Sequence, residues 1–190
     1  MSTERAPSSQ ALTPQQQHLV DLWEQHLRYE FQTRDADATI RTMVPGAYVN
    51  HVPVMTGGTG SDALREFYSR YFIPQMPPDI FPTPVSQTIG PARIVEEAVY
   101  KFTHSLAMDW LLPGVPPTGK PIEIGVVGII QFRDGKIASE HLFWDQATVL
   151  VQLGLIDAAR LPTLGAESAR RLLDPSVPLN QLLARAGKRA

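Results

Sequence analysis

Apolar residues recur every four positions in the first third of the 190-residue chain, which predicts an amphipathic helix ending near Thr33. The stretch TPQQ at residues 13–16 is typical of a capping box with proline at the first helical position, so it places the start of this helix. A second helix is expected from Asp37 to the Pro45-Gly46 pair, and a third over residues 62–72. The repeating apolar positions of the first helix are Leu19, Trp23, Leu27 and Phe31.

From Val85 onward the period of apolar residues changes from helical to alternating, which predicts β-strands. Two of these strands are far longer than the usual length of about 5–6 residues, and long strands generally belong to a strongly twisted, curved sheet. Asp134-Gly135 predicts a tight hairpin between the last two strands. Short helices are expected after Gly154, in DAARLP, AESARRLLD and LNQLLARA. The predicted strands are residues 85–89, 93–106, 120–133 and 137–145.

Helices followed by a meander of strands predict an α+β fold, in which the helices pack on one face of an antiparallel sheet. The chain is long enough to bury one substantial hydrophobic core. The expected divisions are a flexible N-terminus at residues 1–12, a main domain at residues 13–156 and a helical C-terminal extension at residues 157–190.

Composition narrows the possible functions. The chain has no cysteine, which excludes disulfide bonds, thiolate catalysis and thiolate metal sites. A net charge of -2 and a pI near 6.2 leave no basic surplus, so nucleic acid is not an expected partner. The N-terminal stretch lacks the apolar run of a signal peptide, and no stretch has the length to span a bilayer. We therefore expect a cytoplasmic protein without membrane contact.

Strand alternation places ionisable side chains on faces that are otherwise apolar. In the last strand, His141 and Asp145 share a face with Phe143, and in the 93–106 strand His104 lies on the side of Tyr100. Burying an unpaired charge costs several kcal/mol, so such groups pair, lose their charge or line a cavity. A cavity with acid and histidine side chains on its wall is one of these three possibilities.

The residues expected on the opposite face of the last two strands are Glu123, Val127, Ile129, Glu140, Leu142 and Trp144. This face is too apolar for open water, so we expect a second copy of the chain to cover it. The prediction is a homodimer formed through the sheet face.

Each candidate residue also has a structural interpretation. Asp145 directly precedes the predicted helix QATVLVQLG and is a preferred N-cap residue. His51, His104 and His141 can each be a hydrogen-bonded core residue. No metal site is expected, because no His-x-His or His-x-x-x-His pair occurs. The Gly-x-Ser-x-Gly and Gly-x-Gly-x-x-Gly motifs are also missing, so neither a serine triad nor a bound cofactor is predicted.

The order of THS, PPTGK and FRDGKIASEHLFWDQATVLVQLG over residues 15–155 resembles the SnoaL-like polyketide cyclase family of the nuclear transport factor 2-like superfamily. The resemblance implies a cone-shaped fold with the N-terminal helices on the concave face of the sheet. It further implies that Asp145 is the general acid/base and that His51 and His104 are pocket histidines. The link SLAMDWLLPGVPP is longer than usual and a helical tail follows, so the cyclase substrate is not carried over.

The leading hypothesis is therefore a cofactor-independent cyclase or isomerase that acts on a small, mostly apolar carbonyl compound. Asp145 would move a proton beside the carbonyl, as in an intramolecular aldol closure, and His51 or His104 would bind the developing oxyanion. One alternative is a hydrolase in which Asp145 and a histidine activate water against a lactone, ester or epoxide. Another is a non-catalytic module that binds a small ligand or a protein. The expected substrate contacts are His141, Tyr100, Trp110, Phe143 and Trp144.

Overall fold

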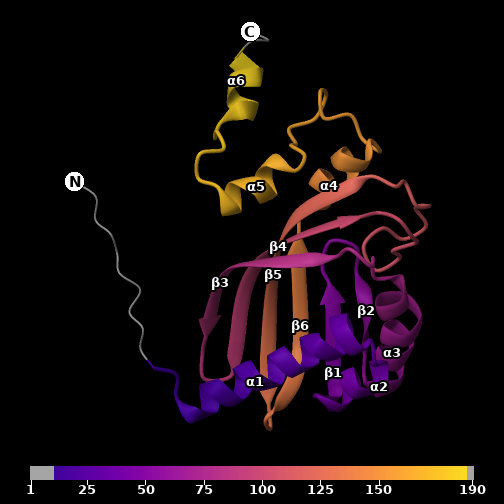
Figure 1. Cartoon of the computed structure of the whole chain (residues 1–190), viewed down its shortest axis with the longest axis vertical. Helices are drawn as coiled ribbons and strands as arrows, with labels where there is room; N and C mark the ends of the chain where they lie inside the picture. The colour runs from indigo at the N-terminus through magenta and orange to yellow at the C-terminus, as the bar shows by residue number, and fades with distance from the viewer. Residues whose placement is uncertain (1–10, 188–190) are drawn as a thin grey trace.

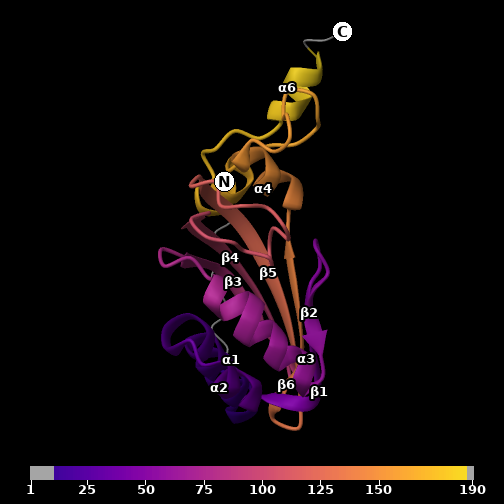
Figure 2. The same ribbon diagram turned by 90° about the vertical axis from the view of Figure 1, so that its right-hand side faces the viewer.

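A computed structural model describes residues 11–187 and contains one six-stranded, curved sheet with helices against it. The predicted α+β fold is confirmed, and α1 runs across one face of the sheet (Figure 1). Most of the N-terminal segment that was predicted to be flexible, residues 1–12, lies outside the described residues. In the view turned by 90°, α1 and α2 lie on one side of the sheet and α6 lies beyond its far end (Figure 2).

The first helix begins as the sequence predicts. The backbone N–H of Gln16 donates to Thr13 Oγ1 at 3.2 Å, and the backbone N–H of Thr13 donates to Gln16 Oε1 at 3.0 Å, which completes the capping box. Beyond Arg28 the helix continues as a π-helical segment, Tyr29–Thr33, and ends at Arg34 with a φ of 54°. The α-helices are α1 (Pro14–Arg28), α2 (Ala36–Arg41), α3 (Ser61–Glu66), α4 (Gln146–Leu153), α5 (Glu167–Leu173) and α6 (Gln181–Gly187).

The sheet is mixed rather than wholly antiparallel. Its strand order is β2-β1-β6-β5-β4-β3, and the predicted meander from β3 to β6 is antiparallel, whereas β1 lies parallel to β6. The second predicted helix ends early because Met43 and Val44 belong to β1, where both side chains are buried. DAARLP forms turns instead of a helix. The strands are β1 (Met43–His51), β2 (Thr56–Thr59), β3 (Phe81–Ile89), β4 (Arg93–Thr103), β5 (Pro121–Arg133) and β6 (Lys136–Trp144).

A β-bulge in β6 places most side chains of this strand on the opposite face of the sheet from the one predicted. Phe132 pairs with Ile137 as expected, but Gln131 pairs with Ser139, which leaves Ala138 without a partner on β5. Because side chains alternate with a period of two, one extra residue moves every later side chain to the other face. The predicted faces are therefore wrong beyond the bulge. The concave side carries Glu140, Leu142 and Trp144, and the outer side carries His141 and Phe143.

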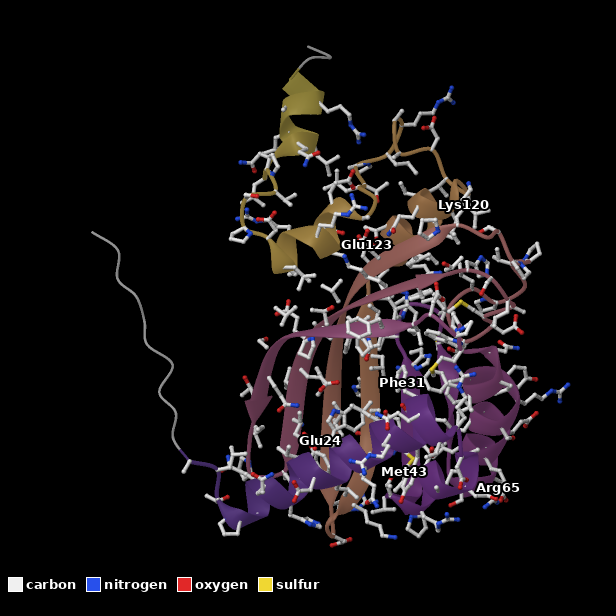
Figure 3. All side chains as sticks on the ribbon, viewed as in Figure 1. Glu24, Phe31, Met43, Arg65, Lys120 and Glu123 are labelled. Carbon is white, nitrogen blue, oxygen red and sulfur yellow. The ribbon has the colours of Figure 1, made fainter. Side chains whose placement is uncertain are left out.

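The C-terminal extension covers part of the outer face. The helix α5 packs on β5, where Leu172 lies over Gly125: a Cβ at this glycine would be 2.6 Å from Leu172 Cδ1, so a larger residue would require this leucine to shift. Figure 3 shows Glu123 beside α5, and its Oε1 lies 2.6 Å from the Arg170 guanidinium. The chain itself therefore covers some of the face that was assigned to a second copy. A homodimer through the remaining outer face stays a prediction.

None of the helices between residues 11 and 187 has both the length and the apolar character that crossing a lipid bilayer requires.

The β1–β2 hairpin depends on a close approach of two backbones. A Cβ at Gly57 would lie 2.0 Å from the carbonyl oxygen of Val49, and the φ of Gly57 is +142°. We expect Gly57→Ala to lower the free energy of unfolding by about 2–4 kcal/mol, measured by urea denaturation, because backbone atoms cannot move aside. Gly46→Ala is the control: a Cβ on this exposed residue of β1 would have nothing within 4 Å, so the substitution should change stability by less than about 0.5 kcal/mol. Equal effects would contradict the packing argument.

Candidate active site

A cavity lies between the concave face of the sheet and the N-terminal helices. Its volume is about 60 Å³, and its lining is mostly aromatic and aliphatic. It adjoins an open groove of about 700 Å³ between α1 and strands β3 and β4, and Trp23, Glu96 and Tyr100 line both spaces. The cavity alone has room for a few water molecules, so a larger ligand would extend into the groove.

Both helical elements that line the cavity continue from α-helix into a π-helical segment that contributes to the lining. Glu30 and Phe31 belong to the segment Tyr29–Thr33, and Tyr68 belongs to the segment Phe67–Phe72. Figure 3 shows Phe31 beyond Glu24 along the course of α1. Segments of π-helix are rare and frequently occur at functional sites.

Four buried polar side chains meet at the cavity wall. The Nε2 atom of His26 lies 3.0 Å from Glu30 Oε1 and 3.2 Å from Glu140 Oε1. The Tyr68 hydroxyl donates to Glu140 Oε1 at 3.4 Å. Each of the four side chains comes from a different element: α1, the segment after it, the Phe67–Phe72 segment and β6. We call His26, Glu30, Tyr68 and Glu140 the buried acid–histidine cluster.

Hydrogen bonding fixes the protonation state of His26. The Thr42 hydroxyl donates its hydrogen to the carbonyl oxygen of Thr39 at 2.6 Å, so it accepts from Nδ1 of His26, also at 2.6 Å. Burial by itself lowers the pKa of His26, but the charges of Glu140 and Glu30 outweigh it and raise this pKa to about 10. Burial has the opposite effect on Glu30 and raises its pKa. At neutral pH the cluster therefore holds an imidazolium ion.

The same atoms could act as metal ligands. Donor atoms of His26, Glu30 and Glu140 all lie within 4.8 Å of one another. A metal ion would have to displace the proton on Nε2, and a histidine pKa of about 10 opposes this at neutral pH. The arrangement therefore favours a proton over a metal ion.

His51 lies at the end of β1 in a different electrostatic environment. Its Nδ1 donates to the carbonyl oxygen of Trp110 at 3.2 Å, and no described residue forms a hydrogen bond with its Nε2. Burial lowers the pKa of His51 to about 4, although the Trp110 carbonyl and the charge of Glu140 act in the opposite direction. His51 is therefore neutral and offers a lone pair at Nε2. The rings within 5.7 Å of its own are those of Phe67, Phe72, Trp110 and Trp144.

Glu96 and Tyr100 lie where the cavity joins the groove. Oε2 of Glu96 accepts from Trp23 Nε1 at 2.9 Å and from Gln87 Nε2 at 3.3 Å. Burial raises the pKa of Glu96, and these two donors oppose the rise. Burial also raises the pKa of Tyr100, whose hydroxyl therefore keeps its proton at neutral pH and can donate a hydrogen bond.

Asp145 is not a cavity residue. It is exposed at the end of β6, where Oδ1 accepts from the backbone N–H of Ala147 at 2.9 Å and of Thr148 at 3.3 Å, so it is the N-cap of α4. The expectation that Asp145 faces the apolar side is wrong, because the bulge at Ala138 exchanges the two faces of β6.

Three other predicted residues also lie outside the cavity. His104 is buried beside the Thr118 segment, and its Nδ1 accepts from the backbone N–H of Thr118 at 3.3 Å. His141 is on the outer face, where its Nε2 lies 2.8 Å from the Tyr48 hydroxyl, and Phe143 is 39% exposed beside it. The predicted residues that do line the cavity are His51, Tyr100, Trp110 and Trp144.

The acids of the cavity are not among the predicted site residues, although two of them carry a signal in the sequence. His26 and Glu30 are four residues apart, beside the apolar stripe of the first helix, which places a polar pair at the edge of the buried surface. Glu96 is the one acidic residue at an even, apolar position of its strand. Glu140 carries no such signal, because its orientation depends on the bulge.

Comparison with known proteins agrees with this architecture. Residues 23–140 match the family model of the SnoaL-like domain. The chain belongs to the SnoaL-like family. The matched region contains every acid that lines the cavity and ends at Glu140, whereas Asp145 lies outside it. A search of curated proteins finds no match.

Several solved structures share the fold at low sequence identity. A protein described as a SnoaL-like polyketide cyclase from Jannaschia sp. CCS1 is 19% identical, with a TM-score of 0.62 over 78% of this chain and 99% of that one. AclR from Streptomyces galilaeus, described as a hydroxylase, is 18% identical, with a TM-score of 0.55 over 73% and 85% of the two chains. SalBIII, named as an epoxide hydrolase/cyclase-like enzyme, is 16% identical, with a TM-score of 0.52 over 72% and 96%. These similarities establish the SnoaL-like fold.

The buried acid–histidine cluster predicts a pH dependence of stability. The folded chain keeps the His26 proton up to about pH 10, whereas the unfolded chain releases it near pH 6.5. The folded state therefore binds more protons in this window, and its stability falls as the pH rises, by at most about 1.4 kcal/mol per pH unit. Urea denaturation between pH 6 and pH 10 measures this fall, and NMR titration of the His26 ring nitrogens measures the pKa directly.

His18→Gln is the control for this titration, because His18 lies on the surface of the same helix and should leave the slope unchanged. A constant free energy of unfolding from pH 6.5 to pH 9, or a neutral His26 ring at pH 8, would contradict the assignment.

Proposed function

We propose that this SnoaL-like protein is a cofactor-independent acid/base enzyme that cyclises or isomerises a small, mostly apolar carbonyl compound, with Glu140 as the acid/base. The observation that carries the proposal is the position of this carboxyl group. Glu140 is 3% exposed at the wall of an apolar cavity, and His26 and Tyr68 both contact its Oε1. No described residue donates a hydrogen bond to Oε2, so this oxygen is available to a ligand.

The proposed reaction begins with transfer of a proton from the carbon beside the carbonyl group to Glu140. The Tyr100 hydroxyl, which has no hydrogen-bond partner among the described residues, donates to the oxygen of the resulting enolate. In an aldol closure the enolate carbon forms a bond to a second carbonyl carbon of the same molecule, and Glu140 returns its proton to that oxygen. In an isomerisation the proton returns to a different carbon.

Typical rate contributions are consistent with these roles for Glu140 and Tyr100. Positioned acid/base catalysis typically contributes a factor of about 10²–10⁴ in rate. Orientation within the aromatic cavity and the hydrogen bond to the enolate oxygen supply further acceleration. His26 keeps Glu140 in one orientation, since its imidazolium ion contacts Oε1 from behind the cavity wall. His51 is neutral and offers a hydrogen-bond acceptor to a hydroxyl group of the ligand.

Hydrogen–deuterium exchange tests this role without knowledge of the natural substrate. Cyclopentanone in D₂O should lose the hydrogens beside its carbonyl group faster with the protein than in buffer, followed by NMR. Glu140→Gln should lower the enzymatic exchange rate by about 10²–10⁴-fold, because the amide cannot accept the proton. Asp145→Asn should keep the rate, since asparagine is a comparable helix cap.

Two outcomes would contradict the assignment: full exchange in folded Glu140→Gln, or loss of exchange in Asp145→Asn. Circular dichroism and urea denaturation of both variants show whether each one is folded. The comparison of these two carboxyl groups decides between the acid in the cavity and the acid at the end of β6.

Hydrolysis by activated water is the second candidate. The cavity, of about 60 Å³, has room for a few water molecules beside the carboxyl groups of Glu30 and Glu140. The name of SalBIII, an epoxide hydrolase/cyclase-like enzyme, is consistent with such chemistry in this fold.

Cyclohexene oxide in H₂¹⁸O tests the second candidate. Hydrolysis should give a diol with one ¹⁸O atom, detected by mass spectrometry, and Glu140→Gln should lower its yield. Exchange of cyclopentanone hydrogens without diol formation would support the cyclase or isomerase. Diol formation without exchange would support the hydrolase.

A further inference from the structure

The charged groups on the cavity wall are all acidic. Glu30, Glu96 and Glu140 line the cavity, and no lysine or arginine of the described residues does so. The adjoining groove has Arg28 on its wall, but also Glu24 and Glu97. The cavity is therefore unfavourable to an anion. The lining also presents the rings of Trp23, Phe31, Tyr100, Phe102, Trp110 and Trp144.

Glu96 is the acid in this lining that has no cationic partner. Glu30 and Glu140 both contact His26, whereas Glu96 contacts the neutral side chains of Trp23 and Gln87. Both of these N–H groups donate to Oε2, and no described residue donates to Oε1. These two donors offset part of the cost of burying the carboxylate, and a positively charged group at the second oxygen would offset more of it.

The residue paired with Glu96 on β5 has no side chain. In the register of β4 and β5, Glu96 lies opposite Gly128, and a Cβ added there would approach Glu96 Cγ to 3.5 Å. Glu96 also lies where the cavity meets the groove, together with the rings of Trp23 and Tyr100. Aromatic faces attract cations, and the attraction grows when the site excludes water.

We propose that the ligand of this cavity carries a small organic ammonium group, held by Glu96 and the neighbouring aromatic rings at the mouth. The carbon skeleton of the ligand then extends inward between the apolar side chains. If the ligand also has a carbonyl group, that end reaches Glu140; only this second contact rests on the proposed function. The cavity therefore distinguishes an amine-bearing compound from a neutral or anionic one of equal size.

Three probes of similar shape and different charge test the proposal at pH 8. Tetramethylammonium is the cation, tert-butanol is the neutral compound and pivalate is the anion. Titrations followed by NMR and by tryptophan fluorescence should show that the cation binds at least about tenfold more tightly than tert-butanol, and that pivalate binds most weakly. Equal binding of the cation and tert-butanol, or preferred binding of pivalate, would overturn the proposal.

Glu96→Gln should weaken tetramethylammonium binding at least about tenfold and change tert-butanol binding less than about twofold. Glu66→Gln, which removes the same charge from an exposed position on α3, should leave both affinities unchanged. Unchanged affinity for the cation in folded Glu96→Gln would overturn the proposal, and so would an equal loss in Glu66→Gln. These titrations involve no turnover, and cyclopentanone has no charge, so the ammonium proposal and the acid/base proposal fail independently.

Discussion

The structure depends on one buried imidazolium ion between two carboxyl groups. His26 is fully buried, and the carboxyl groups of Glu30 and Glu140 offset the cost of its charge. Removing one partner of such a group typically costs about 3–5 kcal/mol, because the other charge stays buried and unpaired. The cluster therefore holds α1, the segment after it and β6 in one arrangement, and this arrangement defines the cavity wall.

Two histidines of this protein have opposite electrostatic surroundings. His26 faces two carboxyl groups and is protonated, whereas His51 lies among four aromatic rings and is neutral. Burial lowers the proton affinity of both rings, so the neighbouring charges decide the result. The cavity thus has the His26 imidazolium ion behind its wall and the neutral hydrogen-bond acceptor of His51 at its surface. This combination suits a ligand that gives up and takes back a proton.

Family membership and site chemistry rest on different observations here. Membership follows from the match over residues 23–140 and from the shared fold, at identities of 16–19% to three solved structures. Identities this low do not fix which side chains line a pocket. In this chain Asp145, the acid at the end of β6, is a helix cap. The proposals for Glu140 and Glu96 therefore rest on the contacts of these residues. The helix α5 covers part of the outer face and is an addition to the curved sheet and its N-terminal helices.

The sequence by itself determined the fold class, the first helix and the long strands, because these depend on local physics. The capping box at Thr13, the alternation along the long strands and the Asp134-Gly135 turn act within a few residues of the chain. Only the tertiary structure decided which acids face the cavity. The set of acids that face the cavity depends on the bulge at Ala138 and on the parallel pairing of β1 with β6. Both concern the register of one strand against its neighbour, which the residue pattern within a single strand does not fix. One unpaired residue moved Glu140 inward, and with it the chemistry of the site.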